Sequence, residues 1–124
     1  SGEFEIDAGY VHSALMNILE NAVDACTRDN TKKKHKIVFG VHKERKHIIF
    51  EVSDNGVGMT PETTEKIFTP FFSSKGRKGT GLGLFISNKI INQHGGEILV
   101  QSTPGKGTQF TIKIPKTPPE GLKK

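Results

Sequence analysis

The chain has 124 residues, of which 33% are hydrophobic and 25% charged, so one globular domain is expected and wholesale disorder is excluded. Eighteen Lys and Arg against 13 Asp and Glu give a formal net charge of +5, which favours anionic partners, phosphate first. The single cysteine excludes an internal disulfide, and no apolar run approaches the roughly 18 residues of a membrane helix.

Hydrophobic periodicity predicts strands where apolar and polar residues alternate, and helices where apolar residues recur every three or four positions. Thr60 followed by Pro61 marks the start of the second helix, and Gly95-Gly96 marks the end of the third. In chain order, the predicted elements are a strand at 4–7, a helix at 9–28, strands at 37–41 and 48–52, helices at 61–67 and 80–94, and strands at 97–101 and 108–114.

This order pairs the strands as hairpins, one of them across the charged segment 42–47, instead of alternating them strictly with helices. The predicted class is therefore α+β: a two-layer α/β sandwich in which about three helices cover one face of a mixed, mostly antiparallel sheet. Residues 1–114 are predicted to form the domain, and 115–124, with three prolines, a flexible tail or linker. Ser1-Gly2 in place of an initiating methionine indicates an excised piece of a longer protein.

Polar residues interrupt the pattern of a plain core in two places. Asn17 and Asn21 lie one turn apart on the polar face of the first helix, where amide oxygens suit a hard cation such as Mg²⁺, or else simply face solvent. The segment Asp54-Asn-Gly-Val-Gly58 directly follows a strand. A carboxylate there could accept a hydrogen bond from an exocyclic amine while bare backbone approaches a flat ring, but the same residues are also typical of an ordinary turn.

A glycine-rich segment and an aromatic cluster precede the third helix. Gly79-Thr-Gly-Leu-Gly83 exposes N–H groups at a helix N-terminus, which favours an anion. It matches neither the Walker spacing nor G-x-G-x-x-G, so neither a P-loop nor a Rossmann site is supported. Phe68-Thr-Pro-Phe-Phe72 leads into the loop 69–79, where the aromatics could anchor a lid or belong to the core.

Taken together and in this order, five segments resemble the N box, the first glycine box, the F box and the second and third glycine elements of sensor histidine kinase ATP-binding domains. That Bergerat fold is shared with gyrase, Hsp90 and MutL, and the resemblance is to the nitrogen-regulator-like branch. It extends from about Phe4 to Pro115. The five segments are His12–Ala22, Asp54–Gly58, Phe68–Phe72, Gly79–Gly83 and Gly105–Thr108.

The resemblance implies a role for each candidate residue. Asn21 would ligate Mg²⁺ on the ATP phosphates, Asp54 would accept from the adenine amino group, and Lys75 would reach the terminal phosphate. Asn17 and Lys75 are the catalytic candidates, and 69–78 would form the ATP lid. The full set of implied ATP-binding residues is Asn17, Asn21, Asp54, Gly56, Gly58, Met59, Lys75, Gly79, Gly81, Leu82, Gly83 and Thr108.

Two positions depart from the family pattern. Many members carry Lys or Arg three residues after the metal-binding Asn, where this chain has Asp24. ATP-hydrolysing relatives carry Glu at the position of Asn17, and an amide offers no base for water, which favours phosphoryl transfer to a protein over hydrolysis. The candidate cations left to neutralise phosphate are Arg28, Lys75, Arg77 and Lys78.

The implied activity is that of the catalytic domain of a protein-histidine kinase, with ATP and Mg²⁺. None of the five histidines lies in the helical hairpin of a phosphoacceptor, and His12 is expected to pack against the apolar side of its helix. The accepting histidine is therefore expected on a separate dimerisation and phosphoacceptor domain, with the receiver domain of a response regulator downstream. The piece itself is expected to be a cytoplasmic monomer, and its parent kinase could be membrane-anchored.

Four other functions compete with this one. A protein serine kinase or an ATPase could use the same fold, and a degenerate domain could sense nucleotide only to dock partners. Nucleic-acid binding through the lysine run at 32–36 is not favoured, because no aromatic residue is interleaved to stack bases.

Overall fold

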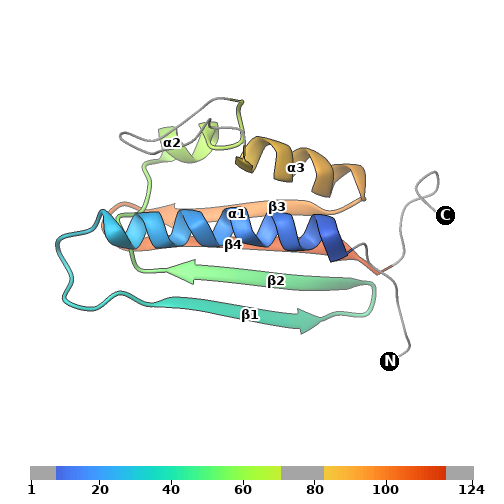
Figure 1. Cartoon of the computed structure of the whole chain (residues 1–124), viewed down its shortest axis with the longest axis horizontal. Helices are drawn as coiled ribbons and strands as arrows, with labels where there is room; N and C mark the ends of the chain where they lie inside the picture. Colours follow the sequence, from blue (N-terminus) through green and yellow to red (C-terminus); the bar gives the residue numbers. More distant parts are fainter. Residues whose placement is uncertain (1–7, 71–82, 117–124) are drawn as a thin grey trace.

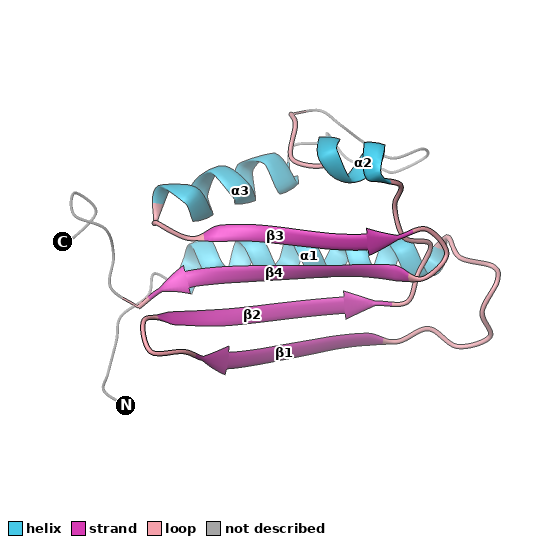
Figure 2. Ribbon diagram, turned by 180° about the vertical axis from the view of Figure 1, so that it is seen from behind, coloured by secondary structure: helices cyan, strands magenta, loops and turns pink. Residues whose placement is uncertain are grey.

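The computed structural model describes residues 8–70 and 83–116. In that part of the chain, three helices lie on one face of a four-stranded sheet (Figures 1 and 2). The elements are α1 (Ala8–Thr27), β1 (Ile37–Lys43), β2 (His47–Asp54), α2 (Pro61–Lys66), α3 (Gly83–Gln93), β3 (Glu97–Thr103) and β4 (Gly107–Pro115). The predicted α+β sandwich is confirmed. The predicted strand at 4–7, most of the predicted lid and the first residues of the predicted helix at 80–94 lie outside the described residues.

The strand order is β1-β2-β4-β3, and each neighbouring pair is antiparallel. β1 with β2 and β3 with β4 form the two predicted hairpins, with strands one or two residues longer at some ends than the periodicity indicates. The two hairpins are joined by the pairing of β2 with β4, and the register of this pair sets Val52 opposite Phe110 and Asp54 opposite Thr108. Apolar residues therefore fill the middle of the helix-covered face, while polar ones stand at the end where β2 stops.

The core lies between this face and α1. Ile18 of α1, Ile91 of α3 and Ile112 of β4 are each at most 1% exposed, and burying one such side chain stabilises the fold by about 1.5–3 kcal/mol. The residues of α1 that face the core recur at helical spacing, at Val11, Ala14, Ile18, Ala22 and Cys26. His12 does not pack as predicted: it is exposed, because it lies beside this stripe and not within it.

The helix ends follow their local sequence. The Thr60 hydroxyl accepts from the Thr63 N–H at 3.2 Å and caps α2, with Pro61 at its first position. Gly95, at φ 84°, ends α3, with the Gly96 N–H donating to the Ile91 carbonyl at 2.9 Å. In the described part of the chain, no helix combines the length and the apolar character needed to cross a membrane.

Candidate functional site

Asn17 links α1 to the start of α3 by side-chain hydrogen bonds. Its Nδ2 donates to the Ser87 hydroxyl at 2.7 Å and to the Gly83 carbonyl at 3.2 Å. Gly83 is close enough that a Cβ there would lie 3.2 Å from Asn17 Oδ1. The amide therefore fixes the first turn of α3, where the predicted anion-binding segment ends, against the polar face of α1.

Asn21, the predicted cation ligand, lies one turn further along the same face. Its Nδ2 donates to the main-chain carbonyl of Asn17 at 3.1 Å, and the residue is half-buried. The amide nitrogen donates to the helix backbone, and the amide oxygen is the atom of this side chain that can ligate a hard cation. Next along this face, Arg28 lies 3.5 Å from the Asp24 carboxylate, so one of the candidate phosphate cations has an acidic neighbour.

Asp54, the predicted base acceptor, is half-buried at the end of β2 on the helix-covered face. Its Oδ1 accepts from the Gly56 N–H at 2.8 Å. Burial raises the pKa of this carboxyl, and the backbone N–H groups of Gly56 and Thr108 oppose the rise, as does the charge of Lys32. Asp54 is thus a carboxylate held in place by backbone, with its charge poorly solvated.

The glycines around Asp54 allow backbone to pack directly against backbone. A Cβ on Gly56 would lie 2.5 Å from the Ala25 carbonyl carbon of α1. Gly58, at φ 71°, and Gly107, at φ 129°, meet the main-chain carbonyls of Thr103 and Asp54 in the same way. Side chains would separate these segments, so the loop after β2 is joined closely to both the end of α1 and the β3–β4 turn.

Thr108 is buried, and a short chain of hydroxyls links it to Met59. Ser102 Oγ donates to the Gly107 carbonyl at 3.0 Å, so the Thr108 hydroxyl, 2.7 Å from Ser102 Oγ, is the donor of that pair. Ser102 Oγ also accepts the Met59 N–H at 2.8 Å. Two predicted base-site residues, Met59 and Thr108, are therefore brought together by a serine that sequence reasoning did not single out.

The structure joins the two predicted regions through α1. Asn21 lies one turn before Ala25, and the Ala25 carbonyl accepts the Val57 N–H at 3.2 Å. The cation candidate and the Asp54 loop are thus attached to the same end of one helix. Four of the predicted site residues lie outside the described part of the chain: Lys75, Gly79, Gly81 and Leu82.

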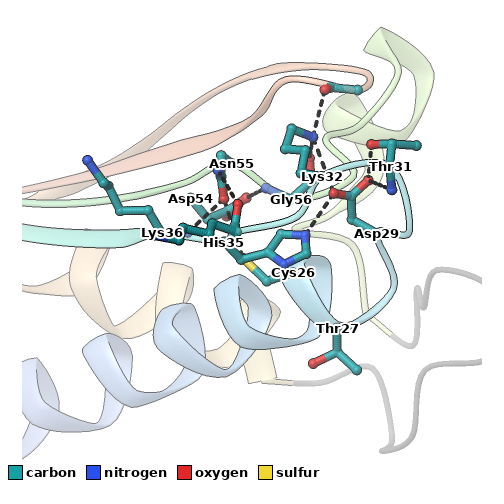
Figure 3. A network of polar contacts seen from close by, with 12 residues as sticks. Cys26, Thr27, Asp29, Thr31, Lys32, His35, Lys36, Asp54, Asn55 and Gly56 are labelled. Carbon is teal, nitrogen blue, oxygen red and sulfur yellow. Dashed lines mark hydrogen bonds and ion pairs between the residues drawn. The ribbon is translucent and has the colours of Figure 1, made fainter.

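The loop between α1 and β1 contributes polar residues that the motif-based analysis did not assign (Figure 3). Asn55 Oδ1 accepts the Lys36 N–H at 2.8 Å, and Lys32 Nζ approaches the Gly56 carbonyl at 3.5 Å. The lysine run at 32–36 is the only sequence signal for this loop. That run does not indicate these contacts, because Asn55 and Gly56 lie about 20 residues further along the chain.

The family model described as "Histidine kinase-, DNA gyrase B-, and HSP90-like ATPase" matches residues 6–118. The sensor histidine kinase ZraS of Salmonella typhimurium is 40% identical over 111 residues, covering 90% of this chain and 23% of that protein. A putative sensor protein of Shewanella frigidimarina is 39% identical over 107 residues, covering 86% of this chain and 16% of that protein. The chain therefore spans about a fifth of the length of these curated relatives.

A solved structure of the catalytic domain of histidine kinase ThkA, in a nucleotide-free form, superposes with a TM-score of 0.76 at 36% identity. The match covers 93% of this chain and 73% of that one. The mycobacterial sensor histidine kinase MprB superposes with the same TM-score at 24% identity, which is a likeness of fold alone.

Proposed function

We propose a function on one premise: the chain belongs to the family of histidine kinase-, DNA gyrase B- and HSP90-like ATPases and has the fold of a histidine kinase catalytic domain. On that premise, it binds Mg²⁺-ATP and donates the γ-phosphoryl group to a histidine on a separate dimerisation and phosphoacceptor domain. The observation that carries the proposal is Asp54, a half-buried carboxylate fixed by backbone N–H groups beside glycines that admit no side chain.

The base end of the site recognises adenine through Asp54. A carboxylate accepts only, so it selects a purine that presents an amino group, and poor solvation strengthens that hydrogen bond. Gly56 and Gly58 keep side chains away from the ring, and Met59 offers an apolar surface beside it. The Thr108 hydroxyl donates its proton to Ser102, so its oxygen keeps lone pairs that can accept from a water at the same end.

The phosphate end is assigned to the polar face of α1 and the start of α3. The Asn21 amide oxygen fits a Mg²⁺ ion, which takes few protein ligands and keeps phosphate oxygens and waters. Bound there, the ion would neutralise charge on the triphosphate. Gly79, Gly81, Leu82 and Gly83 would offer N–H groups to phosphate, and Lys75 would approach the terminal one.

In the proposed reaction, a ring nitrogen of the accepting histidine forms a bond to the γ-phosphorus, and the bond to the β–γ bridging oxygen breaks, releasing ADP. This chain contributes positioning and charge neutralisation. Asn17 supports transfer over hydrolysis, because its amide nitrogen is occupied by Ser87 and Gly83 and its oxygen is no base. A serine kinase, an ATPase and a partner-docking nucleotide sensor are the alternatives.

The proposed partners follow from the same premise. They are the phosphoacceptor domain of the parent kinase and the receiver domain of its response regulator, and the proposed location is the cytoplasm, where ATP is supplied. Supplying a related phosphoacceptor domain with this chain and Mg²⁺-ATP should yield acid-labile phosphohistidine. Acid-stable phosphate on the acceptor would indicate a serine kinase, and phosphate release without an acceptor would indicate an ATPase.

Calorimetry of the 124-residue chain with a nonhydrolysable Mg²⁺-ATP analogue tests binding directly. Asp54→Ala should weaken binding about 10- to 100-fold, the range for losing one hydrogen bond to a charged group. Glu51→Gln, on the opposite face of the same strand, should leave it unchanged. Asn21→Ala should weaken binding only when Mg²⁺ is present. Equal loss with and without Mg²⁺ would contradict its role, and unchanged binding by Asp54→Ala would contradict the whole site.

A further inference from the structure

The loop between α1 and β1 holds a carboxylate that the proposed site does not use. The Asp29 side chain is only 3% exposed. It accepts from the Thr31 hydroxyl at 2.7 Å, from His35 Nε2 at 2.7 Å and from Lys32 Nζ at 3.3 Å (Figure 3). Hydrogen bonds, from Thr31 first and His35 next, hold the pKa of this carboxyl well below its usual range. Asp29 is therefore a fixed anion within the loop.

Lys32 connects this anion to two other parts of the fold. Its Nζ donates to the Gly105 carbonyl at 2.9 Å, in the turn between β3 and β4. The same atom lies 3.5 Å from the Gly56 carbonyl, in the loop after β2. Because an ammonium carries three protons, one lysine can satisfy the carboxylate and both carbonyls together.

The segment between these contacts is the one that carries Asp54. On one side, the Asn55 side chain is bound to the α1–β1 loop, donating to the Lys34 carbonyl at 3.2 Å. On the other side, the Gly105 N–H donates to the Val57 carbonyl at 2.7 Å. The Gly56 N–H holds the Asp54 carboxylate. A displacement of the α1–β1 loop or of the β3–β4 turn would therefore move that carboxylate as well.

We propose that Lys32 is a positioning residue for adenine recognition: anchored by Asp29, it ties the loop after β2 to the β3–β4 turn and so holds the Asp54 carboxylate toward the exocyclic amine of the base. This inference rests on the proposed function. In this proposal, Lys32 does not contact the nucleotide. The effect of Lys32 on nucleotide affinity therefore depends on the amino group that donates to Asp54, and not on the phosphates.

A comparison of two nucleotides isolates that effect. Nonhydrolysable analogues of ATP and of inosine triphosphate share their phosphates, but inosine has a carbonyl where adenine has the amine. Calorimetry of the 124-residue chain with each, in Mg²⁺, gives the wild-type preference for ATP. Lys32→Met should lower that preference about fivefold, the size of one net hydrogen bond. Lys32→Arg, which keeps charge and several donors, should restore most of it.

Lys33→Met is the matched control, because it removes the same charge from an exposed neighbour in the same loop. It should leave the preference unchanged. If Lys32→Met lowers the affinity for both nucleotides equally, Lys32 acts on phosphate or on the fold in general, and the proposal is overturned. Should Lys32→Met not fold, Lys32→Gln is judged by the same ratio. A wild type without any preference for ATP would instead overturn the Asp54 assignment itself.

Discussion

The two ends of the proposed site are held together by different kinds of contact. At the end of β2, main chain packs on main chain: Gly56 touches Ala25, and Gly107 touches Asp54. Where the polar face of α1 meets the start of α3, one amide makes the hydrogen bonds, from Asn17 to Ser87 and Gly83. Backbone contacts cannot adjust without moving whole elements, whereas an amide can rotate. The base end therefore has a main-chain framework, to which side chains such as Lys32 add, whereas the start of α3 depends on the side chain of Asn17.

Gly56→Ala should have the largest effect, on stability. A Cβ there would meet the Ala25 carbonyl carbon, the Ala25 oxygen and the Cys26 nitrogen at 2.5–2.7 Å, so α1 or the loop after β2 must shift. We expect the free energy of unfolding to fall by about 3 kcal/mol, as for a severe overpacking. Chemical denaturation with and without nucleotide measures it.

Gly40→Ala is the control for this change. Gly40 lies in β1 with nothing within 4 Å of a Cβ position, so alanine should be neutral or stabilise by up to about 1 kcal/mol through the unfolded state. If the two alanine variants were equally stable, the base end would not be set by backbone packing, and the comparison of the two ends would fail.

The sequence predicted what is local and missed what the register brings together. The Thr60 cap and the Gly95 helix end each act within a few residues, and each could be predicted from its neighbours. The glycines near Asp54 could be recognised as a motif, but the main-chain partners of Gly56 and Gly58 lie far away in the sequence. The role of Ser102 could not be predicted, because Ser102 comes near Met59 only when β4 pairs with both β3 and β2.

The partners of Asn17 and Lys32 illustrate the same limit. Asn17 donates to Ser87, 70 residues away in the sequence, and Lys32 donates to Gly105, 73 residues away. Neither pair has a spacing that any local period predicts. His12 was misplaced for a related reason: helical spacing fixes a direction around α1, but the extent of the covering sheet decides which directions are buried.

Acidification should weaken nucleotide binding at the base end through Asp54. Desolvation raises the pKa of this carboxyl, so it protonates at a higher pH than an ordinary aspartate. Protonation removes the acceptor for the adenine amine, and below that pKa the affinity should fall by up to about tenfold per pH unit. Calorimetry from pH 7.5 downward measures the decline.

The folding stability of the protein without nucleotide responds to pH in the opposite direction from nucleotide binding. Because the folded pKa lies above the unfolded one, the folded state binds the proton more readily, and the Asp54 contribution to stability grows as the pH falls through that range. Asp54→Asn is the control for binding. This variant has no carboxyl to titrate at position 54, while the nucleotide still protonates as it does with the wild type. An acid decline as steep in Asp54→Asn as in the wild type would remove Asp54 as its cause.

Gly83→Ala should have the smallest effect and addresses the phosphate end. Its Cβ would lie 3.2 Å from Asn17 Oδ1 and 3.3 Å from Asn17 Cγ, so the amide must yield by a few tenths of an ångström. Alanine also favours the helix by about 1 kcal/mol over glycine, which offsets the crowding. We therefore expect stability to change by less than about 1 kcal/mol, while the affinity for Mg²⁺-ATP falls about threefold because the displaced amide loosens the start of α3. In an Asn17→Ala background, the same substitution should cost no affinity, because the crowded side chain is gone. A loss of stability equal to that of Gly56→Ala would show that backbone sets this end too, and the two ends would then be built alike.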